Sequence, residues 1–227
     1  AAAIGALSTL FVYPKNLELY GVYGFLSNTA SLLAPFISLG FGNVLLRYYP
    51  YYKDEGSGHH GLFGFIWTGY AIGICLFSIL FFTFSDSLFL HFFAVDASIR
   101  PFIPYLLPLT ICMVIYELMA CSCINFRKIS LVALANLMLK LVLPLLFLAC
   151  VMNRITAFQF VGMICLYYLV TISSLGGILK KGGEFLIRFT KELWQSTHRK
   201  PMVHYAAYSM LTGVSTIFAL RMDSFCI

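Results

Sequence analysis

Four ionisable side chains lie inside long apolar stretches of this sequence, and they are its main candidates for chemistry. They are Glu117, Lys140, Arg221 and Asp223. If these stretches cross a bilayer, each charge costs about 2.5–3.5 kcal/mol at the membrane centre on insertion scales, so each needs a partner or a water-filled cavity. Ionisable residues in such positions commonly bind a substrate or carry a proton.

Glu117 and Lys140 lie at comparable distances on either side of the connection at Arg127 and Lys128. Because the two flanking stretches are consecutive and antiparallel, we expect both side chains at a similar depth and predict a Glu117–Lys140 ion pair. In a functional interpretation, Lys140 helps to hold an anionic substrate in a polar cavity and Glu117 changes its protonation state. In a structural interpretation, the pair only joins two helices. The sequence leaves both open.

Arg221 and Asp223 are two residues apart, so they do not share a face of a helix. Each is therefore expected to meet a different neighbour. Asp223 is a candidate coupling carboxylate, with a structural ion pair as the alternative.

The composition indicates which elements position these residues. Only 11% of the 227 residues are charged, 60% are hydrophobic and the mean hydropathy is +0.87, whereas a soluble domain carries roughly 25% charged residues. We predict an all-α polytopic transmembrane helix bundle, with about six complete helices, a partial first helix and a truncated seventh. The apolar stretches run over about 1–13, 20–46, 61–84, 102–125, 129–151, 157–179 and 202–227.

Helix-breaking residues interrupt several of these stretches. Pro35, Gly40 and Gly42 lie in the second stretch, Pro108 in the fourth and Pro144 in the fifth. Proline removes a backbone hydrogen bond, and transporters use such breaks where helices bend around a cavity. We predict a hinge at Pro35, Gly40 and Gly42, with an ordinary membrane-helix proline as the alternative.

The distribution of Lys and Arg predicts the orientation. The even-numbered connections hold ten of these residues and the odd-numbered ones only three, so we expect the even connections and the N-terminus to be cytoplasmic. The ten are Arg47, Lys53, Arg127, Lys128, Lys180, Lys181, Arg188, Lys191, Arg199 and Lys200, and the three are Lys15, Arg100 and Arg154. Because these cations are spread over short connections, the net charge of +6 does not indicate nucleic acid as a partner.

The longest polar stretch divides the chain. We predict an N-terminal transmembrane lobe over 1–180, a cytoplasmic amphipathic linker over 181–200 and the start of a second lobe over 201–227. The linker has Phe185, Phe189 and Leu193 at helical spacing among Lys and Arg, which is typical of a helix lying on a membrane surface. The alternative is an ordinary solvated linker. Since the first and last apolar stretches are short or uncapped, we also expect the chain to be part of a longer protein.

No motif for metal binding, a cofactor or enzymatic catalysis is evident. The seven cysteines lie in apolar stretches, and Cys121 and Cys123 face nearly opposite sides of a helix, which favours apolar filling over a metal site. His59 and His60 follow a Gly-Ser-Gly spacer that is typical of an exposed loop. We therefore predict that the protein is not an enzyme and holds no metal or cofactor.

Residues 18–61 carry the most specific pattern in the chain. They combine a Gly-Val-Tyr start (21–23), a leucine-rich run, an LGFG turn (39–42) and an RYYP segment (47–50). This pattern, the ITAFQF segment (155–160) and Asp223 resemble bacterial polysaccharide and lipopolysaccharide biosynthesis membrane proteins. These are the O-antigen-type oligosaccharide flippases of the multidrug/oligosaccharidyl-lipid/polysaccharide exporter superfamily. The resemblance extends along nearly the whole chain.

The resemblance implies a two-lobe transporter of the bacterial inner membrane, of which this chain is the N-terminal half. Its implied substrate is an undecaprenyl-pyrophosphate-linked oligosaccharide, moved from the cytoplasmic to the periplasmic leaflet by alternating access. Lys140 and Arg221 are then the candidates to contact the pyrophosphate or acidic sugars. Membrane lipid and other polysaccharide-assembly membrane proteins are the further implied partners.

Two other functions stay open at this point. One is a multidrug or cation antiporter of the same superfamily, and the other is a non-transporting membrane subunit of glycan assembly. An enzyme of glycan assembly is disfavoured, because none of the connections is long enough for a catalytic extramembrane loop.

Overall fold

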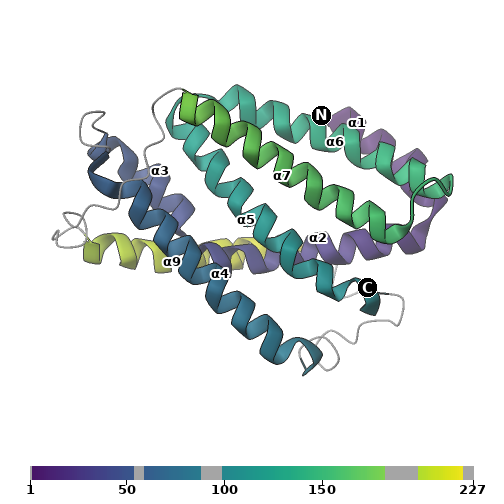
Figure 1. The fold of residues 1–227 in the computed structure, drawn as a ribbon, viewed down its shortest axis with the longest axis horizontal. Coiled ribbons are helices and arrows are strands. Elements are labelled where there is room, and N and C mark those ends of the chain that lie inside the picture. The colour runs from purple at the N-terminus through teal and green to yellow at the C-terminus, as the bar shows by residue number, and fades with distance from the viewer. Residues whose placement is uncertain (1, 54–58, 88–98, 182–198, 222–227) are drawn as a thin grey trace.

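The computed structural model describes residues 2–53, 59–87, 99–181 and 199–221, and all regular secondary structure in these ranges is helical (Figure 1). The chain begins with α1 (Ala2–Leu7), a π-helical turn (Ser8–Val12) and a 3-10 turn (Tyr13–Lys15). Two further 3-10 turns, His59–Gly61 and Arg100–Phe102, precede α4 and α5. The long helices are α2 (Leu17–Ser38), α3 (Phe41–Tyr52), α4 (Leu62–Ser87), α5 (Ile103–Asn125), α6 (Ile129–Val151), α7 (Ala157–Lys181) and α9 (Arg199–Arg221).

Four segments of the described chain are long and apolar enough to cross a membrane, and a fifth is the bent pair of α2 and α3. The four are His59–Thr83, Arg100–Asn125, Ile129–Val151 and Ala157–Lys181. The protein is therefore an all-α polytopic helix bundle, as the sequence predicted. The predicted first and last stretches are not among these spans. In α9 the reason is its polar content, which includes Arg199, Lys200 and His204 in the first turns and several Ser and Thr residues beyond them.

Helix α5 is the central element of the bundle. Half of its membrane-length segment is buried within the protein, against 22–28% for the other three. It packs against α2, α3, α6 and α7, and Figure 1 shows it running between α4 and α7. One face contributes Val114 and Leu118 to a core shared with α3, α4 and α9. Another contributes Leu106 and Leu109 to a core shared with α2, α6 and α7.

The second span is broken where the sequence predicted a break. Leu39 and Gly40 both adopt left-handed backbone conformations, with φ of 48° and 71°, and α2 and α3 meet there at an angle of 49°. A non-glycine residue in this region is strained by about 1–3 kcal/mol and persists only where its surroundings hold it. Leu39 is held by its packing against the core of α3 and α4. The bend is thus confirmed, and its use as a moving hinge stays a prediction.

Helix α4 lies very close to the broken span because it presents glycines to it. Gly69 faces the ring of Phe41, and Gly73 faces the backbone carbonyl of Ile37 so closely that a Cβ there would overlap it. The two glycines form a G-x-x-x-G pair, which allows membrane helices to approach backbone to backbone. This pair brings α4 into contact with residues on both sides of the break.

A capping box starts α7. The backbone N–H of Gln159 donates to the Thr156 hydroxyl at 3.3 Å, and the Gln159 side-chain oxygen accepts from the Thr156 N–H at 2.9 Å. This reciprocal pair satisfies two backbone donors at a helix start. It gives the ITAFQF segment a structural explanation.

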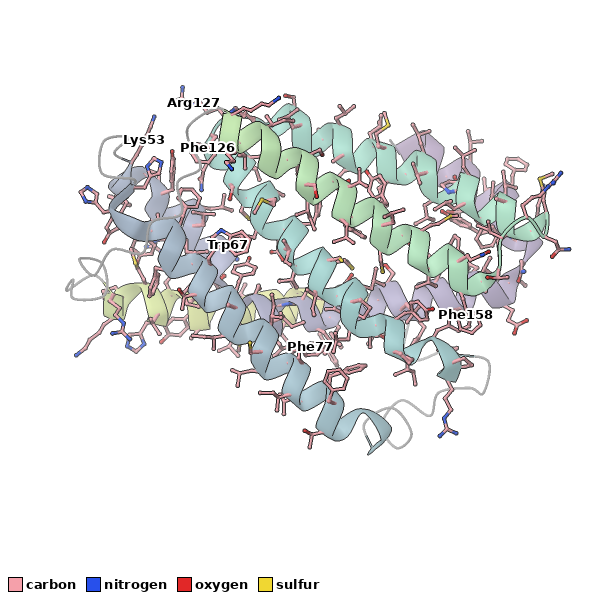
Figure 2. All side chains as sticks on the ribbon, viewed as in Figure 1. Lys53, Trp67, Phe77, Phe126, Arg127 and Phe158 are labelled. Carbon is pink, nitrogen blue, oxygen red and sulfur yellow. The ribbon has the colours of Figure 1, made fainter. Side chains whose placement is uncertain are left out.

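The helix order gathers the cations of the even connections at one end of the bundle. At this end α3, α5 and α7 finish and α6 and α9 begin (Figure 1), and Figure 2 shows Lys53 and Arg127 together there. Its described cations are Lys53, Arg127, Lys128, Lys180, Lys181, Arg199 and Lys200. Lys15, Arg100 and Arg154 lie toward the other end, before α2, before α5 and between α6 and α7. The predicted amphipathic linker is not part of this view, because residues 182–198 lie outside the described residues.

Candidate functional site

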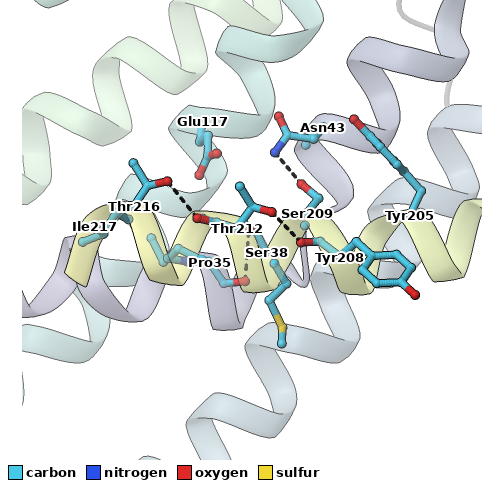
Figure 3. A pocket seen from close by; sticks show the side chains of 15 residues that line it. Pro35, Ser38, Asn43, Glu117, Tyr205, Tyr208, Ser209, Thr212, Thr216 and Ile217 are labelled. Atoms are coloured by element: carbon cyan, nitrogen blue, oxygen red, sulfur yellow. Dashed lines mark hydrogen bonds between the residues drawn. The ribbon is translucent and has the colours of Figure 1, made fainter. Parts of the chain in front are cut away.

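A polar cavity of about 530 Å³ lies beside the broken span. Its walls come from the end of α2, the start of α3, the middle of α5 and one face of α9 (Figure 3). Hydroxyl and amide groups and the rings of two tyrosines share the lining with a larger apolar surface. The polar and aromatic side chains are Ser38, Asn43, Tyr205, Tyr208, Ser209, Thr212 and Thr216.

Glu117 projects from α5 into this cavity (Figure 3). Among the described residues of the lining it is the one carboxylate, and none is Lys, Arg or His. Its side chain is exposed to the cavity even though protein surrounds the site on several sides. A carboxylate at this depth is expensive without a partner or water, and the open cavity supplies access to water or to a bound group.

The hydroxyl of Tyr70 lies behind the carboxylate. Tyr70 is only 1% exposed, and its hydroxyl has no hydrogen-bond partner among the residues that the structure describes. Gly42 makes room for this arrangement: a Cβ at Gly42 would lie 3.0 Å from the Tyr70 hydroxyl and 3.7 Å from Glu117 Oε1. A buried polar group without a partner calls for an explanation. The position of this hydroxyl near Glu117 makes it a candidate for a role in the site.

Helix α9 closes the cavity and is fastened to the start of α3. Asn43 Nδ2 donates to the Ser209 hydroxyl at 2.5 Å. The left-handed Gly40 sits against the backbone of Ala206 and Met210, where a Cβ would not fit. These contacts explain how α9 stays in the bundle although its sequence is too polar to count as a span.

The predicted hinge residues belong to this site. Pro35, Gly40 and Gly42 all line the cavity, and Pro35 also faces Gly213 of α9. A change in the bend would therefore change the shape of the cavity.

The predicted Glu117–Lys140 ion pair does not form, and this corrects the sequence interpretation. The face of α5 that meets α6 carries Tyr116, whose hydroxyl donates to Asn136 Oδ1 at 2.9 Å. Glu117, the next residue, is rotated by about 100° and points to α9 instead. Lys140 lies one turn beyond Asn136 on α6, is exposed and does not line the cavity. Similar depth along two neighbouring helices does not bring the two side chains into contact, because Glu117 projects from a face of α5 that does not meet α6.

The other two candidates, Arg221 and Asp223, lie outside what the structure describes. Only the backbone of Arg221 is described, as the last residue of α9. Substrate binding by Lys140 and Arg221 and coupling by Asp223 stay predictions.

Sequence reasoning missed part of the site. Asn43, Tyr70 and Ser209 are ordinary residues in an apolar context, and only the fold brings them to Glu117. The sequence analysis also did not identify Arg47 as a residue near the site. Its guanidinium lies 4.4 Å from the ring centroid of Tyr205, and Tyr205 lines the cavity. A detectable signal was the G-x-x-x-G pair of α4, which marks the segment that packs on the broken span.

Cys121, Cys123 and His59 are buried in packed parts of the bundle. Cys121 lies in the core of α3 and α4, while Cys123 lies in the core of α6 and α7, so the two do face different neighbours. No cluster of metal-ligating side chains occurs in the described ranges. His59, expected in an exposed loop, is 1% exposed and packs on the rings of Tyr49, Phe63 and Phe126.

The fold and the site together define a polytopic helical membrane protein with a polar cavity beside a broken span. No protein-family model matches the chain, and no curated protein or solved structure matches it at a significant level.

Proposed function

We propose that this protein is a membrane transporter that moves a lipid-linked oligosaccharide across the bacterial inner membrane by alternating access. The observation that carries the proposal is the position of Glu117, a carboxylate with no ion-pair partner among the described residues, in a cavity with several hydroxyl groups next to a broken membrane helix. Transporters place their binding sites at such interrupted helices, where backbone and side chains line water rather than lipid.

The lining of the cavity supports a sugar as the bound group. Asn43, Ser209 and Thr212 offer amide and hydroxyl groups, and Tyr205 and Tyr208 offer aromatic rings. Binding sites for small polar molecules typically combine a few placed polar groups with aromatic walls. The resemblance of residues 18–61 to oligosaccharide flippases agrees with this choice and supplies the lipid carrier.

The orientation follows from the same proposal. With the basic end of the bundle in the cytoplasm, the cavity lies between that end and the membrane centre, and the N-terminus starts inside. Residues 1–180 then form the first lobe, with α9 beginning the next. Motion of the α2–α3 bend against α9 opens or closes the cavity.

Deleting the gene from its host and measuring which leaflet holds the lipid-linked glycan tests the proposal. We expect the glycan to accumulate on the cytoplasmic leaflet, and the wild-type gene to restore export. The Glu117→Gln variant, which keeps the shape and removes the charge, should restore export at least tenfold less well. A matched control is Glu18→Gln, the same change at an exposed position in the first turn of α2.

Two results would contradict the proposal. Normal surface glycan after deletion would exclude an essential flippase. Full rescue by a variant lacking both Glu117 and Lys140 would instead favour a non-transporting subunit of glycan assembly.

One observation favours a second candidate, a cation antiporter. The described lining of the cavity has a carboxylate and no cation, which is the charge that a cationic drug requires. Altered resistance to cationic drugs in the deletion strain, with glycan export unchanged, would select the antiporter.

A further inference from the structure

Arg47 is held in a fixed position by aromatic rings. Its guanidinium carbon lies 4.4 Å from the ring centroid of Tyr205 and 5.9 Å from that of Tyr48, and these two rings meet edge to face at 6.0 Å. Stacking on an aromatic face uses the plane of a guanidinium and leaves its N–H groups at the edge. No carboxylate in the described part of the chain pairs with Arg47.

A second cavity, of about 480 Å³, opens at this edge. Its described lining is Arg47 together with Tyr48, Tyr51 and Tyr52 of the same helix. Tyr51 is 80% exposed, so the cavity is open to the surroundings of the bundle. The guanidinium and the phenol groups of Tyr48 and Tyr51 are potential hydrogen-bond donors, whereas the hydroxyl of Tyr52 is buried. A guanidinium edge fits a phosphate group with two parallel bonds.

The position of this cavity along the bundle corresponds to the level of lipid headgroups. Arg47 lies between one and two turns before the end of α3 at Tyr52, at the end of the bundle that also holds Lys53, Arg127 and Lys200. Tyrosines and basic residues concentrate at this level because the ring sits among the acyl chains and the polar group meets the headgroups. Basic clusters there attract anionic lipids.

The described linings of the two cavities share no residue, but the contact between Arg47 and Tyr205 connects them. Tyr205 carries Arg47 on one side and lines the cavity of Glu117. A phosphate group bound at Arg47 would therefore lie next to a side chain that contacts the lining residue Tyr205 of the first cavity.

We propose that Arg47 and the tyrosines at the end of α3 bind the phosphate of a membrane lipid headgroup and hold that lipid next to the Glu117 cavity. The identity of the lipid as the pyrophosphate carrier of a glycan rests on the proposed function. The binding of a lipid phosphate at Arg47 does not depend on the proposed function.

The test is lipid binding to the purified full chain in nanodiscs, with three probes used in parallel. They are a polyprenyl pyrophosphate, phosphatidylglycerol and free inorganic pyrophosphate. We expect the polyprenyl pyrophosphate to bind, and Arg47→Gln to weaken this binding by about ten- to a hundredfold, as the loss of charge-assisted hydrogen bonds predicts. Arg47→Lys should give an intermediate loss, because it keeps the charge and removes the fork.

Two matched variants separate the site from general charge and from folding. Arg154→Gln removes an exposed arginine at the opposite end of the bundle and should leave binding unchanged. Tyr205→Leu removes the ring that positions the guanidinium and should lose binding with Arg47 still present. Equal thermal unfolding temperatures for these variants show that all of them fold.

Each outcome is decisive. Unchanged binding by Arg47→Gln would overturn the proposal, and so would equal affinity for free inorganic pyrophosphate, which would indicate a soluble anion as the ligand. Equal binding of phosphatidylglycerol and polyprenyl pyrophosphate, both lost in Arg47→Gln, would support the site and count against the glycan carrier as its ligand.

Discussion

The side-chain amide of Asn43 donates a hydrogen bond of 2.5 Å to the hydroxyl of Ser209, residues separated by most of the chain. The bond joins the first turn of α3, directly after the break, to the middle of α9 (Figure 3). It is one of the polar contacts that join α9 to the broken span, together with that between Arg47 and Tyr205. Interhelical hydrogen bonds of this kind contribute about 0.6 kcal/mol on average in membrane proteins, with a maximum near 1.7 kcal/mol.

A double-mutant cycle of Asn43→Ala and Ser209→Ala measures this contact. We expect each single variant to lower the free energy of unfolding and the pair to show a coupling of about 0.5–1.5 kcal/mol, because each variant removes the same bond. Unfolding in mixed micelles supplies the free energies. Strictly additive effects would mean that α9 is held by its apolar contacts alone.

The close backbone contact at Gly73 predicts that a substitution there lowers the free energy of unfolding more than the loss of the Asn43–Ser209 hydrogen bond does. A Cβ at this position overlaps the carbonyl of Ile37, so Gly73→Ala must separate α4 from α2. Overpacking of this type destabilises by about 1–3 kcal/mol. Thermal unfolding of the purified variant is the measurement.

Gly162→Ala is the matched control, since it lies in a helix with open space around its Cβ position. In the interior of a helix, alanine is more stable than glycine by about 0.5–1 kcal/mol. The two variants should therefore shift the unfolding temperature in opposite directions. A neutral Gly73→Ala variant would contradict the close approach of α4 to the break.

Because Glu117 and Lys140 do not contact each other, we expect their effects on the free energy of unfolding to be independent. Combining Glu117→Gln with Lys140→Met should give additive changes in unfolding free energy, within about 0.3–0.5 kcal/mol, as for residues without a shared partner. An ion pair would instead give a clear coupling. Unfolding of the two single variants and the double variant in one detergent decides between them.

The sequence alone allowed a correct prediction of the fold class and of the break in the second span. Both depend on local signals: apolar length for the spans, and proline and glycine in 35–42 for the break. The backbone at Leu39 and Gly40 has the left-handed form that glycine permits most easily. Such properties are encoded within one stretch of chain.

The partner of Glu117 was not predictable in the same way. Depth along a helix follows from counting residues, but the direction of a side chain depends on how each helix is rotated about its axis. That rotation is set by contacts such as Tyr116 to Asn136 and Asn43 to Ser209, which connect helices far apart in the sequence. A reading of each stretch by itself contains no information about them.

The hydroxyl of Tyr70 has no hydrogen-bond partner among the described residues. Removing it distinguishes a structural role of Tyr70 from a functional one. A buried hydroxyl without a hydrogen bond destabilises the fold by roughly 1–3 kcal/mol through lost hydration. Tyr70→Phe removes that hydroxyl and keeps the ring, so the unfolding temperature should stay the same or rise. If the hydroxyl serves the carboxylate of Glu117 during transport, glycan export by the same variant should fall several-fold.

Gly42→Ala tests the relation between Tyr70 and Glu117 by a second substitution. Its methyl group would lie 3.0 Å from the Tyr70 hydroxyl and 3.7 Å from Glu117 Oε1, and so would crowd the space between them. We expect the loss of export to match that of Tyr70→Phe, and the double variant to be no worse than either single one. A stabilised Tyr70→Phe with full export would show that Glu117 acts without this hydroxyl, and that Gly42 only makes room for packing.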